Sequence, residues 1–102
     1  NKSDDGSKAA ELASERQRQN DLYFAALQRN QEQRDQYAAQ IAKNNTIAYN
    51  MRHKAANLLA FGNKAGAQQA YHSMRAAKFA ANADSNMYLY FSSARPTLNL
   101  LA

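Results

Sequence analysis

The chain has 102 residues, of which 22 are alanine, and it contains no valine, no tryptophan, no cysteine and two isoleucines. Alanine is the best helix former, while the β-branched residues that favour strands are scarce, which excludes a β-sheet protein. The lack of cysteine excludes a disulfide framework and thiolate metal sites. The sequence therefore predicts an all-α protein, and we expect no cofactor.

Large apolar side chains are in short supply. Leucine, isoleucine, methionine and phenylalanine total 18 residues, supplemented by six tyrosines. Burial of alanine removes little apolar surface per residue, so a self-sufficient core is not expected. No apolar run approaches the roughly 20 residues of a membrane span, and no signal peptide is visible. We expect copies of the chain and other assembly proteins to supply the missing contacts.

The first predicted helix is long. Residues 1–7 are expected to be a flexible lead-in, and from Lys8 to Phe61 no proline or glycine interrupts the chain. A continuous helix there would be about 80 Å long, too long for a compact chain with a radius of gyration of about 13 Å. The protein is thus expected to be extended. An alternative stays open at Asn44–Thr46, whose side chains compete for backbone hydrogen bonds: a break there would give a compact three-helix bundle.

Phe61-Gly62-Asn63 marks a turn. Gly62 can take the left-handed conformation that ends a helix, and Asn63 can cap the next one. That second helix is expected to run from Lys64 to about Ala83. So short a connection predicts an antiparallel αα-hairpin.

The packing seam of the hairpin follows from residue spacing. In the first helix, apolar and small residues recur in alternating steps of four and three, as in a coiled coil. Folding the chain midway between Gly62 and Asn63 pairs residues whose numbers sum to 125, which brings Met51 to Met74. The predicted seam consists of Tyr37, Ile41, Ala48, Met51, Ala55, Leu58, Gly62, Ala67, Ala70, Tyr71 and Met74.

The C-terminal part is expected to be a short helical segment. Asp84–Asn86 could end the second helix or cap a third one, and Met87–Phe91, although aromatic enough for a strand, has no partner strand. Arg95-Pro96 is expected to stop the helix. The predicted division is a lead-in over residues 1–7, a helical hairpin domain over 8–94 and a docking tail over 95–102.

Charge is segregated along the chain, with −1 over residues 1–40 and +6 over residues 41–102. A basic region suits a phosphate backbone or an acidic protein partner. It also suits solvated helix faces whose counter-charges lie on another subunit. The candidate nucleic-acid contacts scatter around both helices instead of forming one stripe, and they are Lys43, Arg52, Lys54, Lys64, Arg75 and Lys78.

Catalytic signatures are missing from the sequence. Serine and threonine residues have no histidine and aspartate constellation around them, and the acidic residues fit solvated helix faces. His53 and His72 would lie at one level of the hairpin, but a metal site needs further ligands. We expect neither an enzyme nor a metal site.

Residues 37–50 read Tyr-Ala-Ala-Gln-Ile-Ala-Lys-Asn-Asn-Thr-Ile-Ala-Tyr-Asn. In composition and rhythm, residues 20–80 resemble the alanine-, glutamine- and asparagine-rich helices of internal virion (ejection) proteins of short-tailed bacteriophages. Those proteins line the portal and tail channel, leave with the genome and form a conduit through the host envelope. The resemblance implies a structural helical subunit of a homo-oligomeric assembly in the virion. The competing interpretation is a basic helical module that binds nucleic acid or an adaptor protein.

Overall fold

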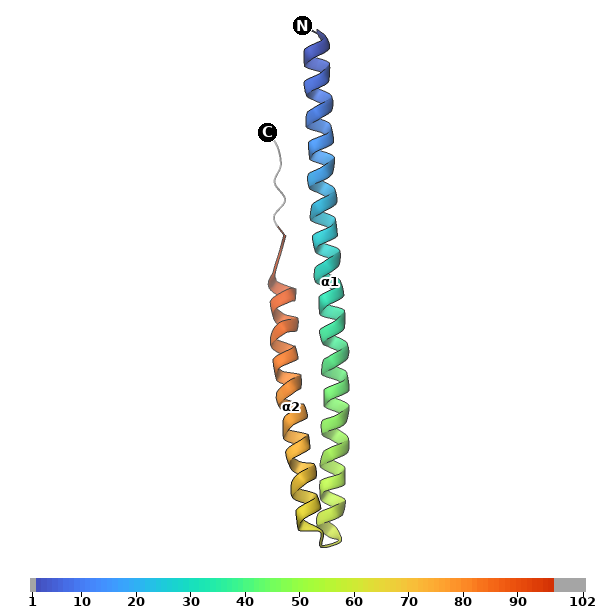
Figure 1. Ribbon diagram of the computed structural model, residues 1–102, viewed down its shortest axis with the longest axis vertical. Coiled ribbons are helices and arrows are strands. Elements are labelled where there is room, and N and C mark those ends of the chain that lie inside the picture. Colours follow the sequence, from blue (N-terminus) through green and yellow to red (C-terminus); the bar gives the residue numbers. More distant parts are fainter. Residues whose placement is uncertain (1, 97–102) are drawn as a thin grey trace.

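The computed structural model describes residues 2–96, with side chains from Asp5 onward, and this part of the chain forms two antiparallel helices (Figure 1). Helix α1 spans Lys2–Ala60 and helix α2 spans Lys64–Ser93. Measured between Cα atoms, the hairpin extends over 91 × 14 × 12 Å and has a radius of gyration of 25.4 Å. A compact chain of this length would have a radius of gyration of about 13 Å. The predicted all-α, extended hairpin is confirmed.

Helix α1 is unbroken over 59 residues. It continues through Asn44–Thr46, where the Thr46 hydroxyl donates to the carbonyl of Ala42 at 3.0 Å, so that the side chain supplements the helical bonding instead of breaking it. The compact three-helix alternative is therefore wrong. The helix also begins at Lys2 instead of Lys8, so residues 2–7 are part of α1 and not a separate lead-in. Asp5 lies in the first turn of α1, where a negative charge interacts favourably with the helix dipole and stabilises the helix.

The turn between the helices is a Schellman motif. The Asn63 amide donates to the carbonyl of Leu58 at 2.8 Å, and the Gly62 amide donates to that of Leu59 at 3.0 Å. Gly62 has a φ of +80°, in the left-handed region. The Asn63 side chain then accepts a hydrogen bond from the Gly66 amide at 2.9 Å, which caps α2. Both predictions for this turn are confirmed.

Helix α2 is longer than the sequence predicted. It passes through Asp84–Asn86 without a break, so the expected C-terminal helical segment is the last part of α2. It ends at Ser93, with the Ala94 amide still bonded to the carbonyl of Tyr90, and Pro96 lies three residues after Ser93. The residue before a proline is driven away from helical conformation, which explains the stop. Residues 97–102 of the predicted docking tail lie outside the described residues.

The core is small and consists mostly of alanine. Met74 packs with Ala48 and Ala77, and Met51 contacts this cluster, so the predicted level of Met51 and Met74 is correct. On α2 the buried positions follow a strict three-four spacing, which keeps one narrow stripe against α1. Within residues 5–96 the buried side chains are Ala48, Ala67, Ala70, Met74, Ala77 and Ala81.

Polar and aromatic contacts extend the pairing above this core. The side-chain amide of Asn44 donates to the Asp84 carboxylate at 3.0 Å, and the Tyr37 ring stacks on that of Phe91 with ring centroids 6.0 Å apart. The Asn30 amide donates to the carbonyl of Ala94 at 3.2 Å. N-terminal to Asn30, helix α1 extends beyond the end of α2 (Figure 1). We call residues 2–29 the N-terminal arm; no described helix lies beside it.

Candidate functional site

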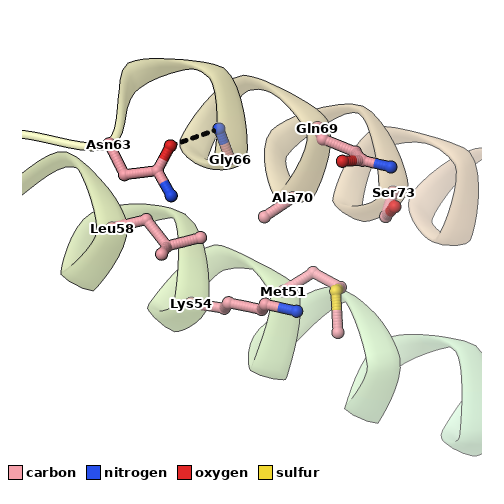
Figure 2. Close-up of a pocket in the computed structure, with 8 residues that line it drawn as sticks. All are labelled: Met51, Lys54, Leu58, Asn63, Gly66, Gln69, Ala70 and Ser73. Carbon is pink, nitrogen blue, oxygen red and sulfur yellow. Dashed lines mark hydrogen bonds between the residues drawn. The ribbon is translucent and has the colours of Figure 1, made fainter.

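Two grooves flank the seam near the turn, one on each side of the hairpin. The first, which we call the cap groove, has a volume of about 380 Å³ and contains the hydrogen bond between Asn63 and Gly66 (Figure 2). Figure 2 shows Ala70 pointing from α2 toward α1, with Met51, Lys54 and Leu58 on the opposing helix. The residues that line it are Met51, Lys54, Leu58, Asn63, Gly66, Gln69, Ala70 and Ser73.

The second groove, which we call the basic groove, has a volume of about 500 Å³. Its small side chains let the two helices approach closely, and its larger apolar members remain open to solvent: Leu59 is 59 % exposed and Tyr71 is 50 % exposed. Arg52 from α1 and Lys64 from α2 bring positive charge to it from both helices. The residues that line it are Arg52, Ala55, Ala56, Leu59, Lys64, Ala67, Gln68 and Tyr71.

The six predicted nucleic-acid contacts are all exposed, and the hairpin divides them unequally. Arg52 and Lys64 line the basic groove. Arg75 and Lys78 follow Tyr71 by four and seven residues, the spacing that keeps side chains on one side of a helix. The prediction that the cations scatter around both helices is therefore wrong for these four. The sequence alone does not show which flanks of the two helices lie next to each other.

The remaining two cations lie on the opposite side. Lys54 lines the cap groove. Lys43 precedes Lys54 by eleven residues, or about three helical turns, so both extend from the same flank of α1. One side of the hairpin thus carries twice as many of these cations as the other.

The positive charge of the hairpin has few carboxylates near it in the sequence. Residues 36–83 contain no aspartate or glutamate. Asp84, the next carboxylate along the chain, accepts the hydrogen bond from Asn44 between the helices. A surface with one sign of charge attracts oppositely charged partners and speeds their association.

The N-terminal arm has a mixed charge distribution with local pairs. Arg18 donates to both carboxylate oxygens of Glu15, one of these bonds being 3.0 Å long, and Gln19 donates to the same carboxylate. These hydrogen bonds, first that from Arg18, lower the pKa of Glu15 to about 2, and the same pairing raises the pKa of Arg18. Asp21 accepts a hydrogen bond from Gln17 at 2.9 Å. The arm is therefore a solvated helix held by bonds one turn apart.

The structure places most residues of the predicted seam between the helices and two of them, Gly62 and Tyr71, outside it. Ala48, Ala67, Ala70 and Met74 are buried, and the half-buried members are Tyr37, Ile41, Met51, Ala55 and Leu58, while Gly62 is exposed at the turn. Tyr71 is half exposed and lies at the basic groove, on the flank of α2, instead of between the helices. One residue after Ala70 on a helix means a rotation of about 100°, which moves Tyr71 to the flank.

The sequence reading missed the contacts of Asp84 and Phe91. Continuing the three-four spacing of α2 beyond Ala81 would have reached positions 84, 88 and 91, because α2 does not end where we expected. That spacing is the signal that could have identified both partners.

The described residues contain no group of three or more histidine, cysteine, aspartate or glutamate side chains that could hold a metal ion. His53 packs its ring against Tyr49 with centroids 4.2 Å apart, and His72 is exposed. In the part of the chain that the structure describes, neither helix combines the length and apolar character that crossing a bilayer requires.

The geometry defines an extended αα-hairpin with a cationic groove beside its turn. No protein family, curated protein or solved structure matches the chain. Its function has to be inferred from its own residues.

Proposed function

We propose that this chain is a structural helical subunit of a larger homo-oligomeric assembly. The observation that supports this most is the contrast between core and surface. Within residues 5–96 the buried side chains are five alanines and one methionine, whereas twelve large hydrophobic side chains are exposed, Phe61 at 87 % and Phe79 at 81 % among them. A core this small buries little apolar surface, so contacts with other copies would supply burial that a single chain lacks.

The N-terminal arm supports the same proposal. Isolated helices gain little stability in water, and most of the stability of a protein helix comes from packing. The arm has no described helix beside it, and its Leu22 and Phe24 side chains are more than half exposed. Neighbouring copies would cover these side chains and add the burial that a single hairpin lacks.

Sedimentation velocity over a range of protein concentrations tests this proposal. We expect the sedimentation coefficient to rise with concentration as the oligomer forms. A species that keeps the monomer mass of 11.4 kDa up to high micromolar concentration, and melts cooperatively at high temperature, would contradict it.

The assembly we favour is a bacteriophage virion, in which the chain would be a component of the ejection channel. The composition and rhythm of residues 20–80 support this, and so does the elongated hairpin. Mass spectrometry of purified particles tests it: the chain should be present in constant stoichiometry with the capsid proteins. Its absence from particles would remove this assignment and leave the oligomer untouched.

A second candidate function is the binding of nucleic acid or an adaptor partner by residues 41–102. The observation in its favour is that Arg52 and Lys64 converge on one groove within residues 36–83, which contain no carboxylate. Binding should weaken steeply with salt, because each neutralised phosphate releases counterions. Affinity for DNA and RNA that is absent, or insensitive to salt, would leave the structural role alone.

A further inference from the structure

The two sides of the hairpin differ in chemistry. The cap groove contains the polar side chains of Asn63, Gln69 and Ser73, along with Lys54. The basic groove combines two cations with an exposed leucine and an exposed tyrosine. Beyond it, the same flank of α2 continues with Arg75 and Lys78.

We propose that this flank is a binding face for single-stranded nucleic acid, formed by Arg52, Lys64, Tyr71, Arg75 and Lys78. The proposal rests on the second candidate function above and specifies its site and ligand. The backbone of the strand runs along the cations of α2, and its bases enter the basic groove beside Tyr71.

Charge identifies the ligand as a polyanion. Four cations occupy the face, and no carboxylate occurs between residues 36 and 83 to oppose them. Lys64 and Lys78 are fourteen residues apart, a distance of about 21 Å along the helix. A stretch of that length meets about six phosphates of one strand in a stacked helical form. The face is therefore long enough to follow a strand instead of a single anion.

The apolar surface identifies the strand as single. Proteins that bind single strands combine a positive groove that follows the backbone with aromatic side chains on which bases stack. The basic groove has this combination, because the half-exposed Tyr71 lines it together with alanines of both helices and two cations. A duplex keeps its bases stacked inside and would meet the face through phosphates alone, leaving Leu59 and Tyr71 without partners.

Two double variants with the same change in charge test the face. Arg52→Gln with Lys64→Gln removes two cations from the basic groove. Lys43→Gln with Lys54→Gln removes two exposed cations from the opposite side and is the matched control. Fluorescence anisotropy with a labelled 20-nucleotide oligothymidylate, between 50 and 200 mM salt, gives affinity and salt slope. Circular dichroism confirms that each variant keeps the hairpin.

We expect the groove variant to bind at least tenfold more weakly, with a log–log salt slope smaller by about 1.4, the loss expected for two phosphate contacts of a single strand. The control should stay within about threefold of the unmodified chain. Tyr71→Leu should also weaken binding about tenfold, whereas Tyr71→Phe should retain it, because stacking needs the ring and not the hydroxyl.

Equal losses in the two double variants would overturn the face and leave the second candidate function standing. Binding of a 20-base-pair duplex as tightly as the single strand would overturn the choice of ligand. Binding of polyglutamate but of no nucleic acid would replace the ligand by an acidic protein. If the chain binds none of the three probes, both the second candidate function and the proposed face are ruled out.

Discussion

Gly62 has a backbone conformation that side chains rarely adopt. Its φ of +80° lets the chain reverse within the three residues that join α1 to α2. The backbone amides of Gly62 and Asn63 donate to carbonyls in the last turn of α1. The space around its Cα is open, so conformation alone requires glycine here.

Gly62→Ala should lower the free energy of unfolding by about 1–2 kcal/mol, the usual cost of a left-handed conformation for an L residue. Gly6→Ala is the matched control, since Gly6 is helical and a Cβ there meets open space. We expect it to be neutral or slightly stabilising, because alanine favours helix over glycine. Urea denaturation of both variants measures the difference, and equal stabilities would contradict the strained turn.

Glu15 should make the arm sensitive to acid. Its pKa is lowered to about 2, chiefly by the hydrogen bonds from Arg18, relative to the ordinary value of 4.5. A carboxylate whose pKa is lower in the folded state stabilises that state above the ordinary pKa, and the contribution is lost as pH falls toward the folded value. We expect arm helicity to decline between about pH 4.5 and 2.

Carboxyl chemical shifts followed by NMR over that pH range measure the titration of Glu15 directly. Arg18→Gln removes two of the three hydrogen bonds that lower the pKa of Glu15, and the bond from Gln19 remains. The midpoint should therefore move up toward the ordinary value. An unchanged midpoint in Arg18→Gln would mean that the pairing with Arg18 does not control this carboxylate in solution.

At the scale of the elements, the pairing of α1 with α2 is fixed by few specific contacts. An alanine stripe packs closely but does not distinguish one register from another, since neighbouring alanines are alike. The hydrogen bond between Asn44 and Asp84 and the stack of Tyr37 on Phe91 do distinguish them. Polar side chains at seam positions serve the same purpose in coiled coils.

Asp84→Ala should therefore cost about 1 kcal/mol, the typical contribution of a hydrogen bond, and leave the half-buried Asn44 amide without its acceptor. Asp35→Ala is the control, because Asp35 is an exposed carboxylate that accepts a bond from Gln31 within α1. Its removal should cost less. Thermal unfolding compares the two, and an equal loss would indicate that Asp84 acts through its charge alone.

Ala70→Leu tests the close approach of the helices. Ala70 is 4 % exposed, so a larger side chain has to push the helices apart, at a cost of about 1–3 kcal/mol. Ala80→Leu places the same side chain on an exposed position of α2 and should change stability little. Thermal melts that fall equally for both variants would show that Ala70 does not lie in the seam.

The sequence contained enough to predict both helices, the turn and most of the seam. Gly62 and Asn63 are local signals, and the four-three spacing from Tyr37 to Leu58 fixes one face of α1. Tyr71 and the division of the cations were not predictable in the same way. They depend on which flank of α1 lies next to which flank of α2. The spacing of residues in the sequence defines the flanks of each helix separately and does not show how they are paired. The length of α2 was not predicted, because residues such as Asp84–Asn86 can either cap the end of a helix or lie inside one.

At the scale of the molecule, stability should vary along the rod. The segment from Asn30 to the turn packs against α2, whereas the arm is a single described helix. Amides in regions with few packing contacts exchange quickly.

Hydrogen exchange followed by mass spectrometry should show rapid exchange in residues 5–29 at low protein concentration and slower exchange in residues 37–58. Raising the concentration should protect the arm if neighbouring copies cover it. Arm protection that is already complete at the lowest concentration would mean that the arm is stable without a partner.

The slenderness of the hairpin has a consequence for transport. Two helices side by side, each about 10–12 Å wide with side chains, present a cross-section of about 20 by 12 Å. A compact chain of this length, with a radius of gyration of about 13 Å, would be more than about 30 Å across in every direction. The hairpin, 91 Å long, can therefore pass lengthwise and still folded through an aperture that would force a globular domain of equal mass to unfold.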